Sequence, residues 1–343
     1  MAGQILTSDY SAPWWLPDGH SQTIAPALWG RTFYAEKTVA QHYQRQRWAA
    51  PDGDFVDVDF GAHAWQPERG LLLLFHGLEG SSQSQYARAL LRWCELQGMG
   101  FAVAHARGCS GEVNHAPRAY HSGDWEEIDW IVQRLHTQLQ AEHGGEHGQA
   151  VPLYAVGVSL GGNALLRWAE ESGEAACRRL RAIAAICSPI DLAAGAQLMD
   201  ASWWQRNIYT RNFLQTMIPR ALERLALHPG LFDGEAMRRV RTFFAFDDLF
   251  TAPLHGFKGA ADYWAQCSAK PHLQALRLPT LLVQTHNDPI VPAYTMPTVA
   301  EVSSSTTLWQ PRTGGHVGFP GSGRWPCSCD VLPAVVGSWL KTH

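Results

Sequence analysis

One serine of this 343-residue chain stands in a pattern that suits a nucleophile. The sequence LYAVGVSLGG is a short apolar run that leads into Gly-x-Ser-x-Gly, with Ser159 at its centre, and then into a helical pattern over residues 163–171. A serine on a tight strand-to-helix turn needs a strained backbone, and Gly157 and Gly161 remove the Cβ atoms that would collide there. The pattern predicts an exposed Ser159 hydroxyl and a Leu160 N–H directed at a developing oxyanion. The alternative is a glycine-rich turn that carries a bystander serine.

The hydroxyl also needs a base to accept its proton and an acid to orient that base. His316, in TGGHVGF, follows the last predicted strand and is our candidate base, with a purely structural loop histidine as the alternative. Two acids follow predicted strands, Asp288 in HNDPIVP and Asp191 in SPID. The order serine, acid, histidine is the one that the nucleophile-elbow fold uses. We expect Asp288 to be the acid, because it follows the next-to-last strand, and Asp191 to cap a helix.

A second oxyanion donor is expected in the loop HGLEG at residues 76–80. Gly77 lets the backbone turn so that the Leu78 N–H faces the serine. His76 precedes the nucleophile in the chain, so we expect it to brace this loop rather than to act as a base. Arg107, after another predicted strand, either binds a substrate carboxylate or phosphate or, as we favour, braces its loop through carbonyls and acids.

The elements that must position these residues alternate along the chain. Continuous apolar runs, typical of parallel strands covered on both faces, occupy residues 70–75, 100–106, 151–158, 182–187, 280–285 and 306–310. Helices are predicted at residues 85–97, 124–140 and 331–340. An antiparallel hairpin is predicted from residues 38–47 and 54–60. This order predicts an α/β fold with a mostly parallel central sheet flanked by helices.

Two segments interrupt this alternation. Residues 142–149 form a polar, glycine-rich stretch in which His143 and His147 could ligate a metal, but a solvated loop is the favoured interpretation. Residues 193–269 are far more than a parallel crossover needs. We expect a helical cap inserted into a single domain of residues 1–343, and the alternative is a set of helices remote from the site.

Composition excludes several other classes of protein. The chain is 46% hydrophobic and 17% charged, its net charge is −4 and it has no basic run, so we expect a large core and no nucleic-acid partner. We find no secretory signal and no apolar stretch of membrane-spanning length. The seven cysteines are scattered, which predicts reduced thiols in a cytoplasmic protein. The fifteen tryptophans are expected mostly in the core or in pocket walls.

With these residues in place, the chain resembles the α/β-hydrolases and, more narrowly, the YheT-like hydrolases, which are related to eukaryotic abhydrolase-domain phospholipases and esterases. The resemblance spans nearly the whole chain, at residues 13–23, 76–81, 107–112, 120–123, 157–163, 246–248, 287–289 and 315–316. It implies the triad Ser159, Asp288 and His316 and an ester-hydrolase activity.

The sequence thus predicts a cofactor-free serine hydrolase that cleaves small-molecule carboxylic esters through an acyl-enzyme, without a bound metal. An acyltransferase or a lipid or acylglycerol hydrolase with the same triad is the nearest alternative. A catalytically silent binding module and a metal-dependent hydrolase are the others. Oligomeric state and acyl chain length stay open.

Overall fold

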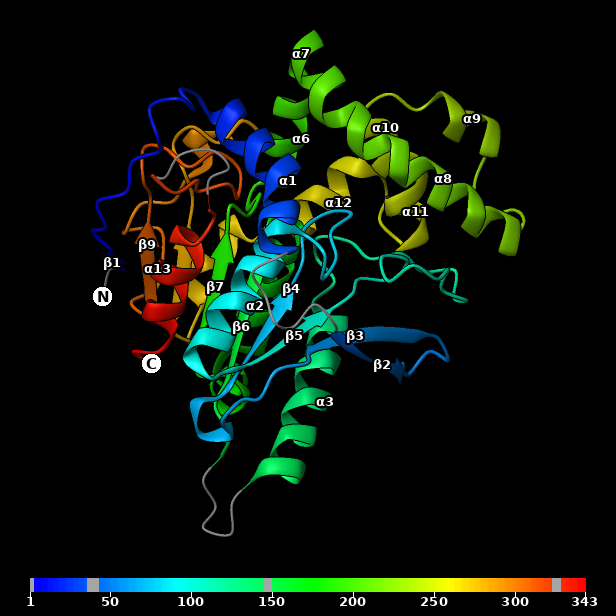
Figure 1. The fold of residues 1–343 in the computed structure, drawn as a ribbon. Coiled ribbons are helices and arrows are strands. Elements are labelled where there is room, and N and C mark those ends of the chain that lie inside the picture. The colour runs from blue at the N-terminus through cyan, green and yellow to red at the C-terminus, as the bar shows by residue number, and fades with distance from the viewer. Residues whose placement is uncertain (1–2, 36–42, 145–149, 323–327) are drawn as a thin grey trace.

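A nine-stranded, mostly parallel sheet forms the centre of the protein (Figure 1). The computed structural model describes residues 3–35, 43–144, 150–322 and 328–343. The strands run in the order β1-β9-β8-β7-β6-β4-β5-β3-β2, and β2 and β3 form an antiparallel hairpin at one edge. Their bounds are β1 Gln4–Ile5, β2 Tyr43–Ala49, β3 Phe55–Gly61, β4 Leu71–Phe75, β5 Gly100–Ala104, β6 Leu153–Val158, β7 Ile183–Ile186, β8 Thr280–Val283 and β9 Thr306–Trp309.

Helices cover both faces of this sheet because its strands are apolar on both faces. Leu71 and Leu73 of β4 pack with residues of α3 and α4, whereas Leu72 and Leu74 pack with residues of α2 and α13. The helices have these bounds: α1 Gly19–Ala35, α2 Gln85–Gln97, α3 Trp125–His143, α4 Leu160–Ser172, α5 Ala176–Arg179, α6 Leu192–Ala201, α7 Trp203–Gln205, α8 Arg211–Leu227, α9 Gly234–Arg239, α10 Phe243–Phe246, α11 Ala252–Leu254, α12 Ala260–Cys267 and α13 Val331–Leu340.

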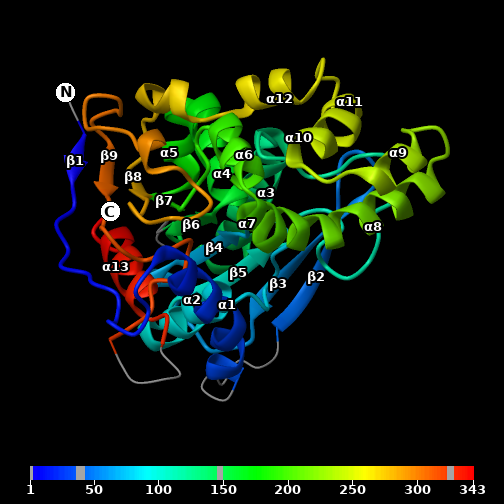
Figure 2. The same cartoon turned by 90° about the horizontal axis from the view of Figure 1, so that it is seen from above.

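Helices α6 to α12 lie between β7 and β8 in the chain, which is the segment where the sequence predicts a helical insertion. Figures 1 and 2 show several of them, together with α1, beyond the ends of the strands at which β4 and β6 terminate. Parallel strands collect the loops that follow them at this edge. The edge therefore brings together the loops after β4, β6, β8 and β9.

The predicted fold class is confirmed, and several element bounds need correction. Every predicted parallel strand is one or two residues shorter in the structure, because hydrogen-bonded pairing stops where the loops leave the sheet. The first hairpin strand extends to Ala49 rather than Arg47, and residues 38–42 of that prediction lie outside the described part. Helix α3 continues to His143, inside the predicted loop, while His147 lies outside the described residues.

Two elements at the N-terminus were missed. The two-residue strand β1 pairs in parallel with β9, and its length is too short for any periodic signal. Helix α1 contains Pro26, which removes a backbone hydrogen bond and argues against a helix when the sequence is read alone.

We predict that the packing of α4 against the sheet contributes strongly to stability. Leu165 is fully buried in it, so Leu165→Ala is expected to lower the free energy of unfolding by about 2–5 kcal/mol through lost burial and a cavity. Leu96→Ala is the matched control, since Leu96 is 69% exposed, and its effect is expected to stay below about 0.5 kcal/mol. Urea unfolding of both variants measures the difference, and equal effects would contradict this packing.

Candidate active site

Ser159 occupies the junction between β6 and α4, as its motif predicts. Its φ of 53° lies in the left-handed region, which costs a non-glycine residue about 1–3 kcal/mol. A Cβ at Gly161 would overlap the carbonyl oxygens of His76 and Phe75, so only glycine lets the elbow approach the loop after β4. The Ser159 N–H donates to the Ile186 carbonyl at 2.8 Å and ties the elbow to β7.

The predicted base and acid lie beside this serine. His316 Nε2 is 3.0 Å from Ser159 Oγ, and His316 Nδ1 is 2.8 Å from Asp288 Oδ2. The other oxygen of Asp288 accepts hydrogen bonds from the N–H groups of Ile290 and Val291 at 2.8 and 2.9 Å. With Nδ1–H donating to the carboxylate, Nε2 is left as the acceptor for the serine proton.

Asp191, the other candidate acid, lies elsewhere. Its carboxylate accepts a hydrogen bond from the Ala194 N–H at 3.0 Å and caps helix α6, as expected from its sequence context. It makes no hydrogen bond to His316 within the described part of the chain.

Residues of helix α1 bind the loop that contains His316, and the sequence alone did not predict this contact. The His316 N–H donates to Thr23 Oγ1 at 2.8 Å. Gln22 Oε1 accepts hydrogen bonds from the Gly314 N–H and from Asn287 Nδ2, both at 2.8 Å, so it links the loop of the base to the loop of the acid. Gln22 and Thr23 lie in residues 13–23, one of the segments that resemble the YheT-like hydrolases. That resemblance was the only indication in the sequence that these two residues contribute to the site.

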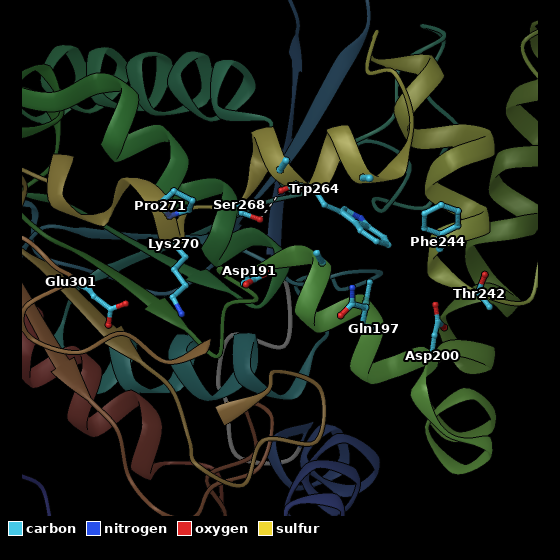
Figure 3. A pocket seen from close by; sticks show the side chains of 14 residues that line it. Asp191, Gln197, Asp200, Thr242, Phe244, Trp264, Ser268, Lys270, Pro271 and Glu301 are labelled. Carbon is cyan, nitrogen blue, oxygen red and sulfur yellow. Dashed lines mark hydrogen bonds between the residues drawn. The ribbon is translucent and has the colours of Figure 1, made fainter. Parts of the chain in front are cut away.

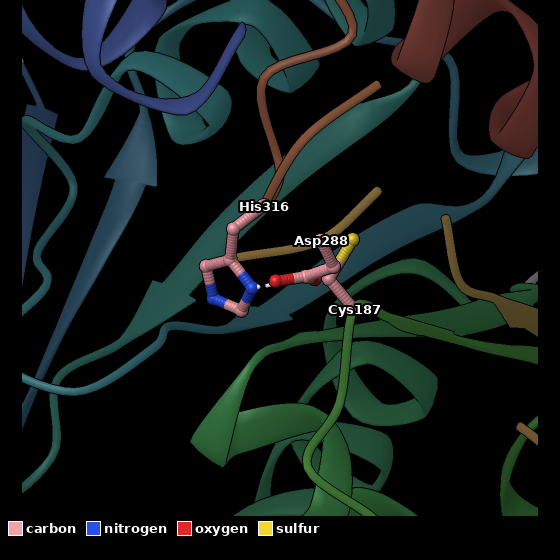
Figure 4. A group of neighbouring side chains, drawn as sticks. All are labelled: Cys187, Asp288 and His316. Atoms are coloured by element: carbon pink, nitrogen blue, oxygen red, sulfur yellow. Dashed lines mark hydrogen bonds and ion pairs between the residues drawn. The ribbon is translucent and has the colours of Figure 1, made fainter. Parts of the chain in front are cut away.

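Cys187 is a buried neighbour of the acid and the base (Figure 4). Its sulfur accepts a hydrogen bond from the Val317 N–H at 3.4 Å. Side-chain ligand atoms of Cys187, Asp288 and His316 lie within 4.8 Å of one another, a spacing that a metal ion would also permit. Burial raises the pKa of the Cys187 thiol well above its usual value. Both ring nitrogens of His316 already have partners, Asp288 at Nδ1 and Ser159 at Nε2, so this group fits a proton-transfer site better than a metal centre.

The loop after β4 presents Leu78 next to the serine. Tyr86 and Tyr120 hydroxyls accept the N–H groups of Gly77 and Glu79 at 3.0 and 3.1 Å, and the intervening Leu78 N–H donates to no group among the described residues. The Leu160 N–H is the first of helix α4, where a helix leaves its amides without internal partners. Leu78 and Leu160 both line the cavity that contains Ser159 and His316. Two N–H groups are thus free to stabilise negative charge there.

His76 and Arg107 brace loops, the role favoured for each. His76 accepts the Ala106 N–H at Nε2 and contacts the Gly77 carbonyl through Nδ1 at 2.8 Å. Burial lowers the pKa of His76 to about 4, which keeps the ring neutral. The Arg107 guanidinium forms ion pairs with three carboxylates, those of Asp52, Asp54 and Glu127.

Backbone strain is concentrated around this site. Five described non-glycine residues have positive φ, namely Glu79, Ser159, Cys187, Val317 and Phe319. All five belong to the loops after β4, β6, β7 and β9 that surround Ser159 and His316. Strained residues persist only where their surroundings fix them, and they are concentrated at functional sites.

Two cavities flank helix α6. The one that contains Ser159 has a volume of about 110 Å³, and its walls are mainly apolar, from Leu192, Met199, Phe213, Met217, Phe243 and Ile290. Trp264 is the only tryptophan among the described residues that line it. A larger outer cavity of about 970 Å³ lies beyond α6 and α12 (Figure 3). Ala196 and Trp264 line both cavities, and Asp191 lines only the outer one.

Comparison with known proteins identifies the class to which this fold and site belong. Residues 70–321 match the model of the alpha/beta hydrolase fold family, and the chain belongs to that family. The protein YheT of Escherichia coli (strain K12), which is named as an esterase, is 35% identical over 330 residues that cover 94% of this chain and 90% of YheT. Phospholipase ABHD3 of Mus musculus is 24% identical, over 98% of this chain and 79% of that protein.

Solved structures support the same fold. The esterase Pf2001 of Pyrococcus furiosus superposes with a TM-score of 0.54 at 12% identity, covering 99% of this chain and 98% of that one. At 12% identity, this similarity supports the fold and says nothing about the activity. Among the described residues, no helix combines the length and the apolar character required to span a bilayer.

The buried, neutral state of His76 predicts a specific pH dependence. Its folded pKa is about 4 against the ordinary value of 6.5, so the unfolded state binds this proton first as the pH falls. Stability from His76 is therefore complete above pH 6.5 and is lost toward pH 4. We expect the stability deficit of His76→Asn, relative to wild type, to shrink by about 2 kcal/mol between pH 7.5 and pH 5.

Urea unfolding at the two pH values measures this difference. The same substitution at the exposed His115 is the matched control for replacing an imidazole outside the core. A His76→Asn deficit that stays constant with pH would contradict a neutral histidine at this position.

Proposed function

We propose that this protein is a serine hydrolase that cleaves carboxylic esters, with Ser159 as nucleophile, His316 as base and Asp288 as the orienting acid. The observation that carries the proposal is the chain of two hydrogen bonds from Ser159 Oγ through the His316 imidazole to Asp288, at 3.0 and 2.8 Å. Membership of the α/β-hydrolase family and relatives named as esterases and lipases support the same chemistry.

The geometry supports a two-step mechanism. Ser159 Oγ attacks the ester carbonyl while His316 Nε2 takes its proton, and Asp288 stabilises the imidazolium. The N–H groups of Leu78 and Leu160 hold the oxyanion, each contributing roughly 3 kcal/mol to transition-state stabilisation. His316 then returns the proton to the leaving alcohol. Water, activated by the same histidine, releases the acid from the acyl-enzyme. None of these steps requires a cofactor.

We propose further that residues 193–269 act as a cap within a single domain of residues 1–343. Helices α6, α8, α10 and α12 of this segment contribute side chains to the Ser159 cavity, including those of Met199, Phe213, Phe243 and Trp264. The cap would therefore set the size of the acyl group that reaches Ser159.

The protein is proposed to act in the cytoplasm on small-molecule esters. The six described cysteines that form no disulfide are Cys94, Cys109, Cys177, Cys187, Cys267 and Cys329. Such thiols suit a reducing compartment.

We predict that Ser159→Ala abolishes turnover of p-nitrophenyl butyrate, by up to about a millionfold in kcat, and abolishes labelling by a fluorophosphonate probe. Asp288→Asn should lower kcat by about ten-thousandfold, because the imidazole loses its orienting carboxylate. Asp191→Asn is the matched control and should keep wild-type kinetics, since asparagine also caps helices. Activity above about a tenth in Ser159→Ala would contradict the assigned nucleophile. Loss of activity only in Asp191→Asn would contradict the assigned acid.

We also predict that the cap controls chain length. The cavity of about 110 Å³ favours short acyl groups, and Phe213→Ala enlarges it. In a series of p-nitrophenyl esters from acetate to decanoate, the optimum of kcat/KM should move to longer chains in Phe213→Ala. Phe244→Ala is the control, because Phe244 lines only the outer cavity. An optimum that does not move in Phe213→Ala, or that moves equally in both variants, would contradict acyl binding beneath the cap.

A further inference from the structure

A second cavity, with several charged side chains in its wall, adjoins the apolar cavity that contains Ser159. Its volume is about 80 Å³. The residues that line both cavities are Leu78, Leu160, Met217, Asp247 and Tyr263. The two proposed oxyanion donors therefore stand where one cavity meets the other. Beyond them, the wall of this second cavity includes four further charged side chains, those of Glu79, Arg107, Arg220 and Arg224.

One face of helix α8 supplies two of these cations. Arg220 and Arg224 are four residues apart, which places them on the same side of the helix, and like charges at this spacing repel each other. Arg220 is partly exposed and pairs with Glu79 at 3.1 Å, so part of its charge is compensated. Arg224 forms no ion pair with any described residue.

Arg224 is a buried cation without a carboxylate partner. Its residue is only 5% exposed, and Nη1 donates one hydrogen bond, of 3.3 Å, to the Ala116 carbonyl. No other hydrogen bond and no ion pair of this guanidinium occurs within the described part of the chain. Burial lowers its pKa, the more distant Asp54 carboxylate opposes this effect, and the neighbouring Arg107 adds to it. Asp54 forms its ion pair with Arg107, at 3.2 Å, and not with Arg224. Arg107 itself is surrounded by three carboxylates. A buried charge that lacks a counterion is costly, and an anionic ligand would remove that cost.

Three nearby features do not replace a direct carboxylate partner for Arg224. The Glu79 carboxylate pairs with Arg220 instead. Arg224 lies in the last turn of α8, where a cation interacts favourably with the helix dipole, but that effect also operates at an exposed surface and does not require burial. Asp247 lines the cavity, yet its carboxylate oxygens accept hydrogen bonds from Thr251 and Trp264 at 2.7 and 2.8 Å. Burial raises the pKa of Asp247 to about 6, and no ion pair joins its carboxylate to Arg224 among the described residues.

We propose that Arg224, assisted by Arg220, forms an anion subsite, and that the natural substrate is an ester carrying a carboxylate or phosphate group in addition to its reacting carbonyl. The substrate would span the two cavities, with its carbonyl at Ser159, an apolar part in the Ser159 cavity and its anionic group at Arg224. The planar guanidinium suits either oxyanion, because its parallel N–H groups match two oxygens of a carboxylate or phosphate. This inference rests on the proposed ester hydrolysis at Ser159.

The test compares two matched pairs of substrates. One pair, mono-p-nitrophenyl adipate and p-nitrophenyl hexanoate, differs by a carboxylate on the acyl part. The other, 1-butanoylglycerol 3-phosphate and 1-butanoylglycerol, differs by a phosphate on the alcohol part, and its short acyl group suits the small Ser159 cavity. For each pair, the ratio of kcat/KM for the anionic over the neutral ester is measured in wild type, Arg224→Ala, Arg224→Lys and the exposed control Arg239→Ala.

We expect wild type to prefer the anionic ester in at least one pair, which also identifies the part of the substrate that carries the charge. Arg224→Ala should lower that ratio by roughly 10- to 100-fold, Arg224→Lys by less, and Arg239→Ala not at all. A wild-type ratio near one in both pairs, or a preference that Arg224→Ala leaves intact, would overturn the inference.

The proposed function is judged separately from the subsite. If wild type hydrolyses the neutral esters and Ser159→Ala does not, the proposed ester hydrolysis is supported whether or not the anion subsite exists. Circular dichroism checks that Arg224→Ala folds. If it does not, Arg224→Gln, which keeps a hydrogen-bond donor without the charge, replaces it in the same comparison.

Discussion

The hydrogen bond between Ser159 Oγ and His316 Nε2 is the contact on which the site depends. It joins residues 157 positions apart in the chain, and its 3.0 Å length requires two loops from different strands to be fixed against each other. Neither loop adopts a relaxed backbone, since Ser159 and Val317 both have positive φ. Each strained residue costs about 1–3 kcal/mol, and the packing of the sheet beneath the loops must offset this cost.

Close approach of backbone segments makes the elbow possible. Gly161 lies against the carbonyls of His76 and Phe75, so the nucleophile turn and the loop with Leu78 are in direct contact. Because of that contact, Leu160 at the start of α4 and Leu78 both line the cavity that contains Ser159. His76, neutral in its buried position, fixes the second loop by bonding to Ala106 after the neighbouring strand β5.

Much of this arrangement could be predicted because local patterns carry it. Continuous apolar runs of four to eight residues indicated the parallel strands, and the glycine spacing around Ser159 indicated the turn. Asp288 and Asp191 could be ranked by their places relative to strands, and the helix cap at Asp191 follows from its own sequence context. The contributions of α1 were not predictable in this way. Pro26 lies inside α1 and argues against a helix when the sequence is read alone. Gln22 and Thr23 contribute through hydrogen bonds with residues nearly 300 positions away in the chain.

The sequence by itself determined the type of chemistry and the class of fold. A serine between spaced glycines, an acid and a histidine after successive strands can be recognised without coordinates, because each feature depends on its neighbours in the chain. Only the tertiary structure decided the sizes of the cavities, the support of the His316 loop by α1 and the absence of a carboxylate partner for Arg224 among the described residues. These properties arise where the helices between β7 and β8 pack over loops from distant strands. Such long-range contacts leave no periodic signal in the sequence.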